Sequence, residues 1–150
     1  MKKILSILLL SLAGVAAYAQ SAEKISQIVE SQELTFGQAA YLALAYSGDI
    51  EEDVSEAEAL EAAVKKNWIK NGAVDTAAIK LSELSALYLK ATGIKGGLFY
   101  RVSGKSGRYA FKELKARNLL DKAADPAMTI TGQNALSLFN SCVKIAEGSK

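Results

Sequence analysis

Apolar residues recur along most of this 150-residue chain at the three- and four-residue spacing that places side chains on one face of an α-helix. A stripe of this kind predicts a helix that buries one side and exposes the other. The four clearest stripes are Leu60, Val64 and Trp68; Leu81, Leu84, Leu87, Tyr88 and Ala91; Phe111, Leu114, Asn118 and Leu119; and Ala135, Leu138, Phe139, Cys142 and Ala146. The pattern predicts an all-α protein.

Signals for the starts and ends of helices flank these stripes. The segments from Thr35 to Gln38 and from Ser55 to Glu58 have the order of capping boxes, which satisfy the first amides of a helix. Helical runs are followed by a residue for which positive φ costs little, at Gly48, Gly72 and Gly93. We expect about five to six helices, joined as tandem helix-loop-helix pairs and packed as one domain.

An internal repeat emerges when the chain is aligned with itself. An ungapped alignment places residues 61–93 over residues 112–144. A weaker third copy of the second helix lies at residues 34–40, beside residues 130–136. Chance apolar periodicity is the alternative, since identities are few, but helix pairs that bury their faces on one another readily build such a core. The matched positions include Lys66 and Arg117, Asn67 and Asn118, Trp68 and Leu119, and Leu87 and Leu138.

The stretch at residues 93–107 departs from the helical pattern. It holds five glycines and the run from Leu98 to Val102, which is rich in residues that favour extended structure. We expect a long glycine-rich connection between the repeats that allows a short extended segment. Long connections of this kind often carry function.

The N-terminus has the order of a bacterial secretory signal. Two lysines precede an apolar run at residues 4–12, and an A-x-A cleavage site stands at residues 17–19. A short membrane anchor is the alternative, but a span needs about 20 apolar residues. No cysteine near the cleavage site offers a point for lipid attachment. We predict a cleaved signal peptide at residues 1–19 and a periplasmic or secreted helical domain at residues 20–150.

Composition and charge refine this expectation. Half of the residues are apolar and one is proline, which argues for a folded chain. Cys142 has no internal disulfide partner and lies in an apolar stripe, so we expect a buried, inert thiol. Residues 21–63 carry ten acids and one base, whereas residues 64–150 carry fifteen bases and six acids. This dipolar arrangement favours charged partners or head-to-tail self-association.

The chain offers little catalytic chemistry. It has no histidine, which removes the usual general base and the commonest transition-metal ligand. The acids at residues 51–53 lie in a polar linker, so a solvated helix start is favoured over a catalytic pair. We therefore expect a protein that is not an enzyme, with no metal and no cofactor. A small-ligand-binding or inhibitor-type helical protein and a carboxylate-dependent hydrolase are the alternatives.

An aromatic-Ala-aromatic cluster at residues 109–111 is followed by Leu119-Leu120, a loop, and the segment Ile130-Thr131-Gly132-Gln133-Asn134-Ala135. This order resembles the S-layer homology repeat over residues 55–147. The resemblance implies three helix pairs around a common axis and the binding of anionic cell-wall polymers. The chain departs from that pattern because the family's glycine-rich loop is reduced at residues 121–126. The arginine of the second-helix motif is also replaced, by Phe36, Leu81 and Gly132, so the family's polymer contacts do not carry over to these positions.

A basic and aromatic stretch at residues 95–117 is the remaining candidate for binding. Cations neutralise polyanions, and aromatic faces stack on sugars or bases. A solvated helix face with its aromatic rings in the core is the alternative. The candidate binding residues are Lys95, Tyr100, Arg101, Lys105, Arg108, Tyr109 and Lys112.

These observations together predict a non-catalytic structural or interaction module of the cell envelope. Its expected partner is an envelope protein or an anionic wall polymer. Export argues against nucleic acid as the polyanion, and we expect no membrane span after signal cleavage.

Overall fold

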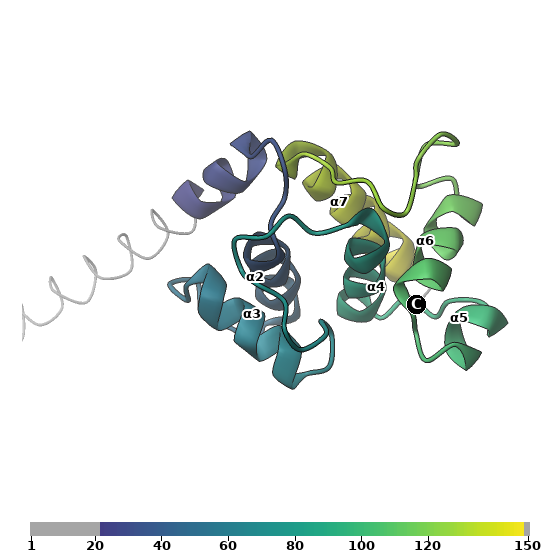
Figure 1. Cartoon of the computed structure of the whole chain (residues 1–150), viewed down its shortest axis with the longest axis horizontal. Coiled ribbons are helices and arrows are strands. Elements are labelled where there is room, and N and C mark those ends of the chain that lie inside the picture. Colours follow the sequence, from purple (N-terminus) through teal and green to yellow (C-terminus); the bar gives the residue numbers. More distant parts are fainter. Residues whose placement is uncertain (1–21, 149–150) are drawn as a thin grey trace, which may run out of the picture.

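The computed structural model describes residues 22–148, whose regular structure consists of helices joined by loops (Figure 1). After a helix at residues 22–30 come α2 (Phe36–Ser47), α3 (Glu56–Lys65), α4 (Leu81–Thr92), α5 (Leu98–Val102), α6 (Gly107–Ala116) and α7 (Gly132–Gly148). The predicted all-α fold is confirmed, and the one β interaction of the described residues is an isolated bridge between Thr35 and Ala78. No helix in this part of the chain is long and apolar enough to cross a membrane. The predicted signal at residues 1–19 lies outside the described residues.

Local sequence signals set several helix boundaries. Thr35 and Ser55 are the N-caps of α2 and α3, and each forms the predicted capping box, with Gln38 and Glu58 respectively. The glycines that follow α2 and α4 are left-handed, with φ of 71° and 70°. These ends therefore follow from short-range chemistry alone.

The helices form three pairs arranged in a ring. The first helices of the pairs are the one at residues 22–30, α3 and α6, and the second helices are α2, α4 and α7. α3 packs against α2 of the preceding pair, and α6 packs against α4. The ring closes where the helix at residues 22–30 meets α7, because a Cβ added to Gly132 would lie 1.6 Å from the carbonyl oxygen of Ile28. Glycine is the residue that permits this approach.

Backbone hydrogen bonds follow the same ring. The first amide of each second helix donates to a carbonyl in the loop of another pair. The three bonds run from Phe36 to Ala77 (2.9 Å), from Leu81 to Met128 (2.8 Å) and from Gly132 to Ser31 (3.0 Å). Near them, the amide of Ile79 donates to Leu34 and the amide of Leu34 donates to Ile130, each over 2.9 Å. The three loops therefore meet at the centre of the ring.

The internal repeat relates matched features of the second and third pairs. Helices α3 and α6 have the same length, and their N-caps, Ser55 and Ser106, stand in the same register of the repeat alignment. Both helices are followed by a left-handed asparagine, Asn67 with φ of 55° and Asn118 with φ of 57°. The amide after each asparagine donates to the carbonyl five residues earlier. The two helices thus end in the same turn.

Burial at matched positions is only partly as predicted. Leu87 and Leu138 are both buried, with exposed fractions of 0% and 6%. Trp68 and Leu119 are half-buried rather than buried. Each of them follows the left-handed turn at the edge of the core, so that one face of the side chain meets solvent. Cys142 is fully buried, and burial raises the pKa of its thiol to about 11, as an inert thiol requires.

The glycine-rich connection at residues 93–107 contains α5 where an extended segment was expected. Tyr100 is 3% exposed, and its ring packs on Gly96, where an added Cβ would lie 2.3 Å from the ring. Burial of this ring outweighs the local preference of the run for extended structure. The described part of the chain accordingly has seven helices rather than five to six.

Candidate functional site

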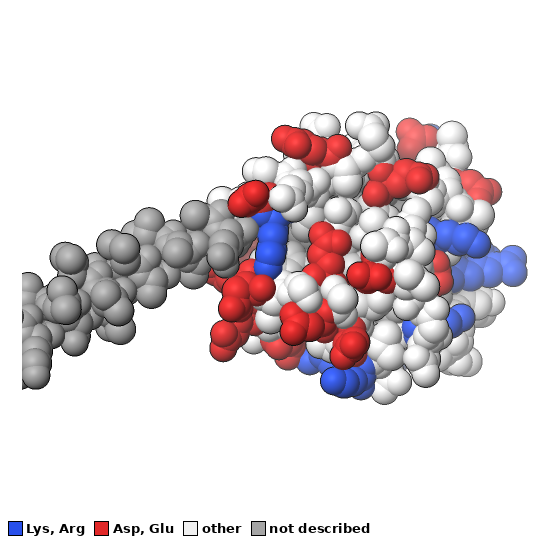
Figure 2. All heavy atoms as spheres, turned by 60° about the vertical axis from the view of Figure 1, so that its left-hand side comes forward, with Lys and Arg blue, Asp and Glu red and all other residues white. Residues whose placement is uncertain are grey.

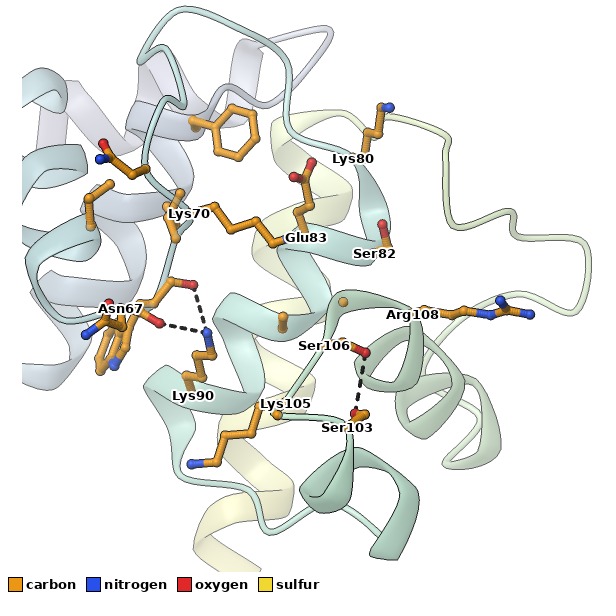
Figure 3. A pocket seen from close by; sticks show the side chains of 18 of the residues that line it. Asn67, Lys70, Lys80, Ser82, Glu83, Lys90, Ser103, Lys105, Ser106 and Arg108 are labelled. Carbon is orange, nitrogen blue, oxygen red and sulfur yellow. Dashed lines mark hydrogen bonds between the residues drawn. The ribbon is translucent and has the colours of Figure 1, made fainter.

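A groove of about 1120 Å³ lies between the second and third helix pairs (Figure 3). One wall is the end of α3 with the loop that follows it, and the opposite wall is the connection from α5 to α6. α4 runs between the two walls. The groove therefore depends on the ring, because it is bounded by segments from two different pairs.

The groove is strongly basic. Its lining contains one acid, Glu83, which forms no ion pair among the described residues. Six cations come from α3, α4, α6 and the loops between them. They are Lys65, Lys70, Lys80, Lys90, Lys105 and Arg108. Such a surplus raises the local concentration of anions and favours their binding.

Lys90 is the most constrained of these cations. Its ammonium group donates to the backbone carbonyl oxygens of Asn67 (2.9 Å) and Trp68 (3.2 Å), so the α4 side chain is tied to the turn after α3 (Figure 3). Partial burial lowers the pKa of Lys90, and the positive charges of Lys105 and Lys70 lower it further. Lys90 therefore has two cationic neighbours in the groove lining, and none of the three lysines pairs with a carboxylate among the described residues.

The indole ring of Trp68 adds an aromatic surface to the groove. The Lys66 ammonium lies 5.0 Å from the centroid of the Trp68 ring and pairs with Asp49 over 2.8 Å. That contact holds the half-buried indole at the groove wall. An aromatic face beside several cations suits a ligand that carries both sugar rings and anionic groups.

The lysine cluster belongs to one of the three inter-pair junctions. The position that corresponds to Lys90 of α4 is Ala45 in α2 and Ser141 in α7. Neither residue carries a charge. The shared architecture is therefore specialised at the junction between the second and third pairs.

The structure separates the residues that the sequence grouped into one site. Lys105 and Arg108 line the groove, although the Arg108 side chain extends away from it in Figure 3. Tyr109 and Lys112 border a smaller hollow beside α5. Lys95 and Arg101 are exposed outside both.

Tyr100 is buried at the base of the smaller hollow, which it lines together with Tyr109 and Lys112. Its ring is buried, and its hydroxyl group has no hydrogen-bond partner among the described residues. Burial, with a smaller contribution from Glu113, raises its pKa to about 12. Tyr100 thus offers little surface to a ligand, whereas Tyr109 is half-buried.

The site predicted from the sequence did not include the groove cations that come from α3, from α4 and from the loop between them. Lys65, Lys70, Lys80 and Lys90 lie outside the basic stretch at residues 95–117, and folding brings them opposite Lys105. The available signal was the surplus of bases from residue 64 onward, which contains them all. Among residues 22–148 no group of three His, Cys, Asp or Glu residues could hold a metal ion.

No model of a protein family, no curated protein and no solved structure matches this chain. The site is therefore interpreted from its own geometry and charge.

Proposed function

We propose that this protein is a non-catalytic interaction module of the cell envelope and that its basic groove binds an anionic wall polymer. The observation that carries the proposal is a groove lined by six cations, Lys70, Lys90 and Lys105 among them, and by one acid. An anion placed there relieves the repulsion that lowers the pKa of Lys90.

The number of cations favours a polymer over a single small anion. A small anion contacts two or three cationic groups at once, whereas six line this groove. A chain of repeated anionic groups engages them together, and the Trp68 face offers a stacking surface for a sugar ring. Each contact is weak in water, so affinity depends on their number.

The arrangement of the helices also favours an anionic polymer as the ligand, because it resembles the arrangement implied by the S-layer homology repeat. The ring of three helix pairs agrees with the arrangement that the S-layer homology repeat implies, and we propose a distant relationship on this basis. Phe36, Leu81 and Gly132, which replace the motif arginine, begin α2, α4 and α7 and bond to neighbouring loops. The groove lysines stand at other positions, so the contacts to the polymer are this chain's own.

Titration calorimetry with an anionic polysaccharide, polygalacturonate, tests the proposal. We expect binding to weaken as the salt concentration rises, because dissolved ions screen the attraction between charges, and the Debye length is about 10 Å at 0.1 M. The Lys70→Gln, Lys105→Gln double variant should bind about tenfold more weakly, the loss of about 1.4 kcal/mol. A matched control, Lys122→Gln with Lys144→Gln, removes two exposed cations that do not line the groove.

Two further measurements sharpen this test. Neutral dextran should not bind, and equal binding of dextran would assign the groove to sugar rather than to charge. Polyglutamate stands in for the acidic face of a partner protein. Acidic side chains spread over the side of the molecule formed by its N-terminal elements, shown in Figure 2, so a second copy is one such partner. Failure of polygalacturonate to bind, or equal binding by both double variants, refutes the polymer proposal.

The envelope location is a proposal that a separate measurement addresses. Intact mass of the protein recovered from the envelope fraction should correspond to a chain that begins at Gln20. A mass that retains residues 1–19 would indicate an uncleaved anchor.

A further inference from the structure

Helix α5 lies at one edge of the molecule (Figure 1). It carries three large apolar side chains that are exposed to solvent. Leu98, Phe99 and Val102 are 64%, 74% and 78% exposed, and we call them the α5 tip. Single exposed apolar residues are common on protein surfaces, but three within five positions form a patch. The α5 tip is therefore a candidate contact surface.

The α5 tip is held in place by the rest of the helix. Tyr100, in the middle of α5, is buried against Gly96, which fixes the direction in which its neighbours point. The Phe99 ring stacks on Tyr109 of α6, with centroids 6.2 Å apart and an interplanar angle of 14°. Phe99 thus has a defined position although most of its surface meets solvent.

Cations lie on α5 and on the segments that flank it, without an opposing free acid; Lys112 lines the same hollow as Leu98 and Phe99, whereas Lys105 and Arg108 also line the groove. The exposed cations on α5, on α6 and in the flanking connections are Lys95, Arg101, Lys105, Arg108 and Lys112. Glu113 is the single acid at residues 93–117. Its carboxylate accepts a hydrogen bond from the Gly97 amide (2.9 Å) and pairs with Arg117 (2.8 Å). The surface is therefore apolar at its centre and positive at its rim.

We propose that the α5 tip docks the protein on an anionic lipid surface. Apolar side chains can enter the boundary between headgroups and acyl chains while nearby cations pair with lipid phosphates. A stable protein interface buries about 1,200 Å² or more, and a five-residue helix at the edge of the molecule supplies little of it. A fluid bilayer requires no matching shape. The α5 tip does not line the groove, so lipid docking does not rest on the proposed polymer binding.

Vesicle flotation tests this proposal with the full chain. The protein should float with vesicles that mix phosphatidylglycerol and phosphatidylcholine, and much less with pure phosphatidylcholine. The Phe99→Ser, Val102→Ser double variant should lower the partition coefficient at least about tenfold, a loss of about 1.4 kcal/mol. All forms share one N-terminus, so any contribution of residues 1–19 is common to them.

Matched control variants distinguish docking through the α5 tip from non-specific adsorption to vesicles. Val74→Ser removes an exposed valine (57%) outside the α5 tip and should leave flotation unchanged. Arg101→Gln with Lys112→Gln should weaken binding to anionic vesicles, whereas Lys144→Gln should not. Circular dichroism checks that every variant is folded.

A fluorescent reporter adds a readout of insertion. Val102→Cys can be labelled with a polarity-sensitive dye, because the native Cys142 thiol is fully buried. We expect its emission to shift to the blue with anionic vesicles, whereas a dye at Val74→Cys should not respond. Absence of binding, or equal binding by the double serine variant, overturns the proposal. A wild-type dimer that the same variant converts to a monomer, with vesicle binding unaffected, assigns the α5 tip to a second copy instead.

Discussion

Gly132→Ala probes the closure of the ring most directly. An alanine Cβ at this position would lie 1.6 Å from the carbonyl oxygen of Ile28, while real Cβ contacts stay beyond 3.0 Å. The helix at residues 22–30 and the start of α7 must therefore separate until this contact reaches an ordinary distance. The atom in the way belongs to the backbone, so no change of rotamer relieves the clash.

The expected cost follows from what the separation disrupts. Overpacking of this kind costs about 1–3 kcal/mol. The hydrogen bond from the Gly132 amide to Ser31 contributes about 1 kcal/mol, and Ile28, 1% exposed, loses part of the roughly 2 kcal/mol of its burial. The protein either keeps the contact under strain or separates the two helices, so these costs are not added together. We therefore expect the free energy of unfolding to fall by about 3 kcal/mol, the upper end of the overpacking range. For a chain of this size that lowers Tm by about 10 °C.

Urea and thermal unfolding followed by circular dichroism measure this loss. Gly148→Ala, at the end of the same helix, is the matched control, because an added Cβ there meets nothing within 4 Å. Its stability should change by less than about 0.5 kcal/mol. Limited proteolysis should release the segment around residues 22–30 faster from Gly132→Ala than from wild type. Equal stability of the two alanine variants would refute the described closure.

Three further predictions concern the core, the repeated turn and the groove. Leu138→Ala should cost about 2–5 kcal/mol in urea unfolding, whereas Leu98→Ala at the exposed α5 should cost less than about 0.5 kcal/mol; similar losses would contradict the described core. Asn67→Ala and Asn118→Ala should each cost about 1 kcal/mol because alanine resists positive φ, and glycine at either position should restore stability; a loss at only one of them would show that the turns are not equivalent. Folding lowers the pKa of Lys90 below its usual 10.5. At a pH below this lowered pKa, Lys90 is charged in both states, and its partly buried charge reduces the stability of the folded protein. The free energy of unfolding should therefore rise with pH between the folded-state and the unfolded-state pKa of Lys90. If a Lys90→Met variant shows the same rise, Lys90 is not its cause.

Much of the helical framework could be predicted from short-range patterns. The capping boxes at Thr35 and Ser55 and the left-handed glycines after α2 and α4 lie where the sequence indicates. These features depend on hydrogen bonds between residues a few positions apart. The α5 helix could not be predicted in this way, since it depends on burying Tyr100 against α6 and Gly96.

The candidate site was predictable only in part. The charge surplus after residue 64 indicates an anion-binding surface, and Lys105 belongs to it. Its partners Lys70 and Lys90 come from the loop after α3 and from α4, two segments that precede the basic stretch. No local pattern shows that these three lysines line one groove.

The sequence by itself determined that this protein is helical, where α2 and α3 begin, where α2 and α4 end, and that its charge is divided between two halves. Those properties arise from spacing, capping and composition, which act over a few residues. Only the tertiary structure decided that the three helix pairs close into a ring, because closure depends on contacts such as Gly132 against Ile28, which lie near opposite ends of the described chain. The groove and the α5 tip likewise follow from tertiary packing, since packing selects which side chains are buried, which line a groove and which face solvent.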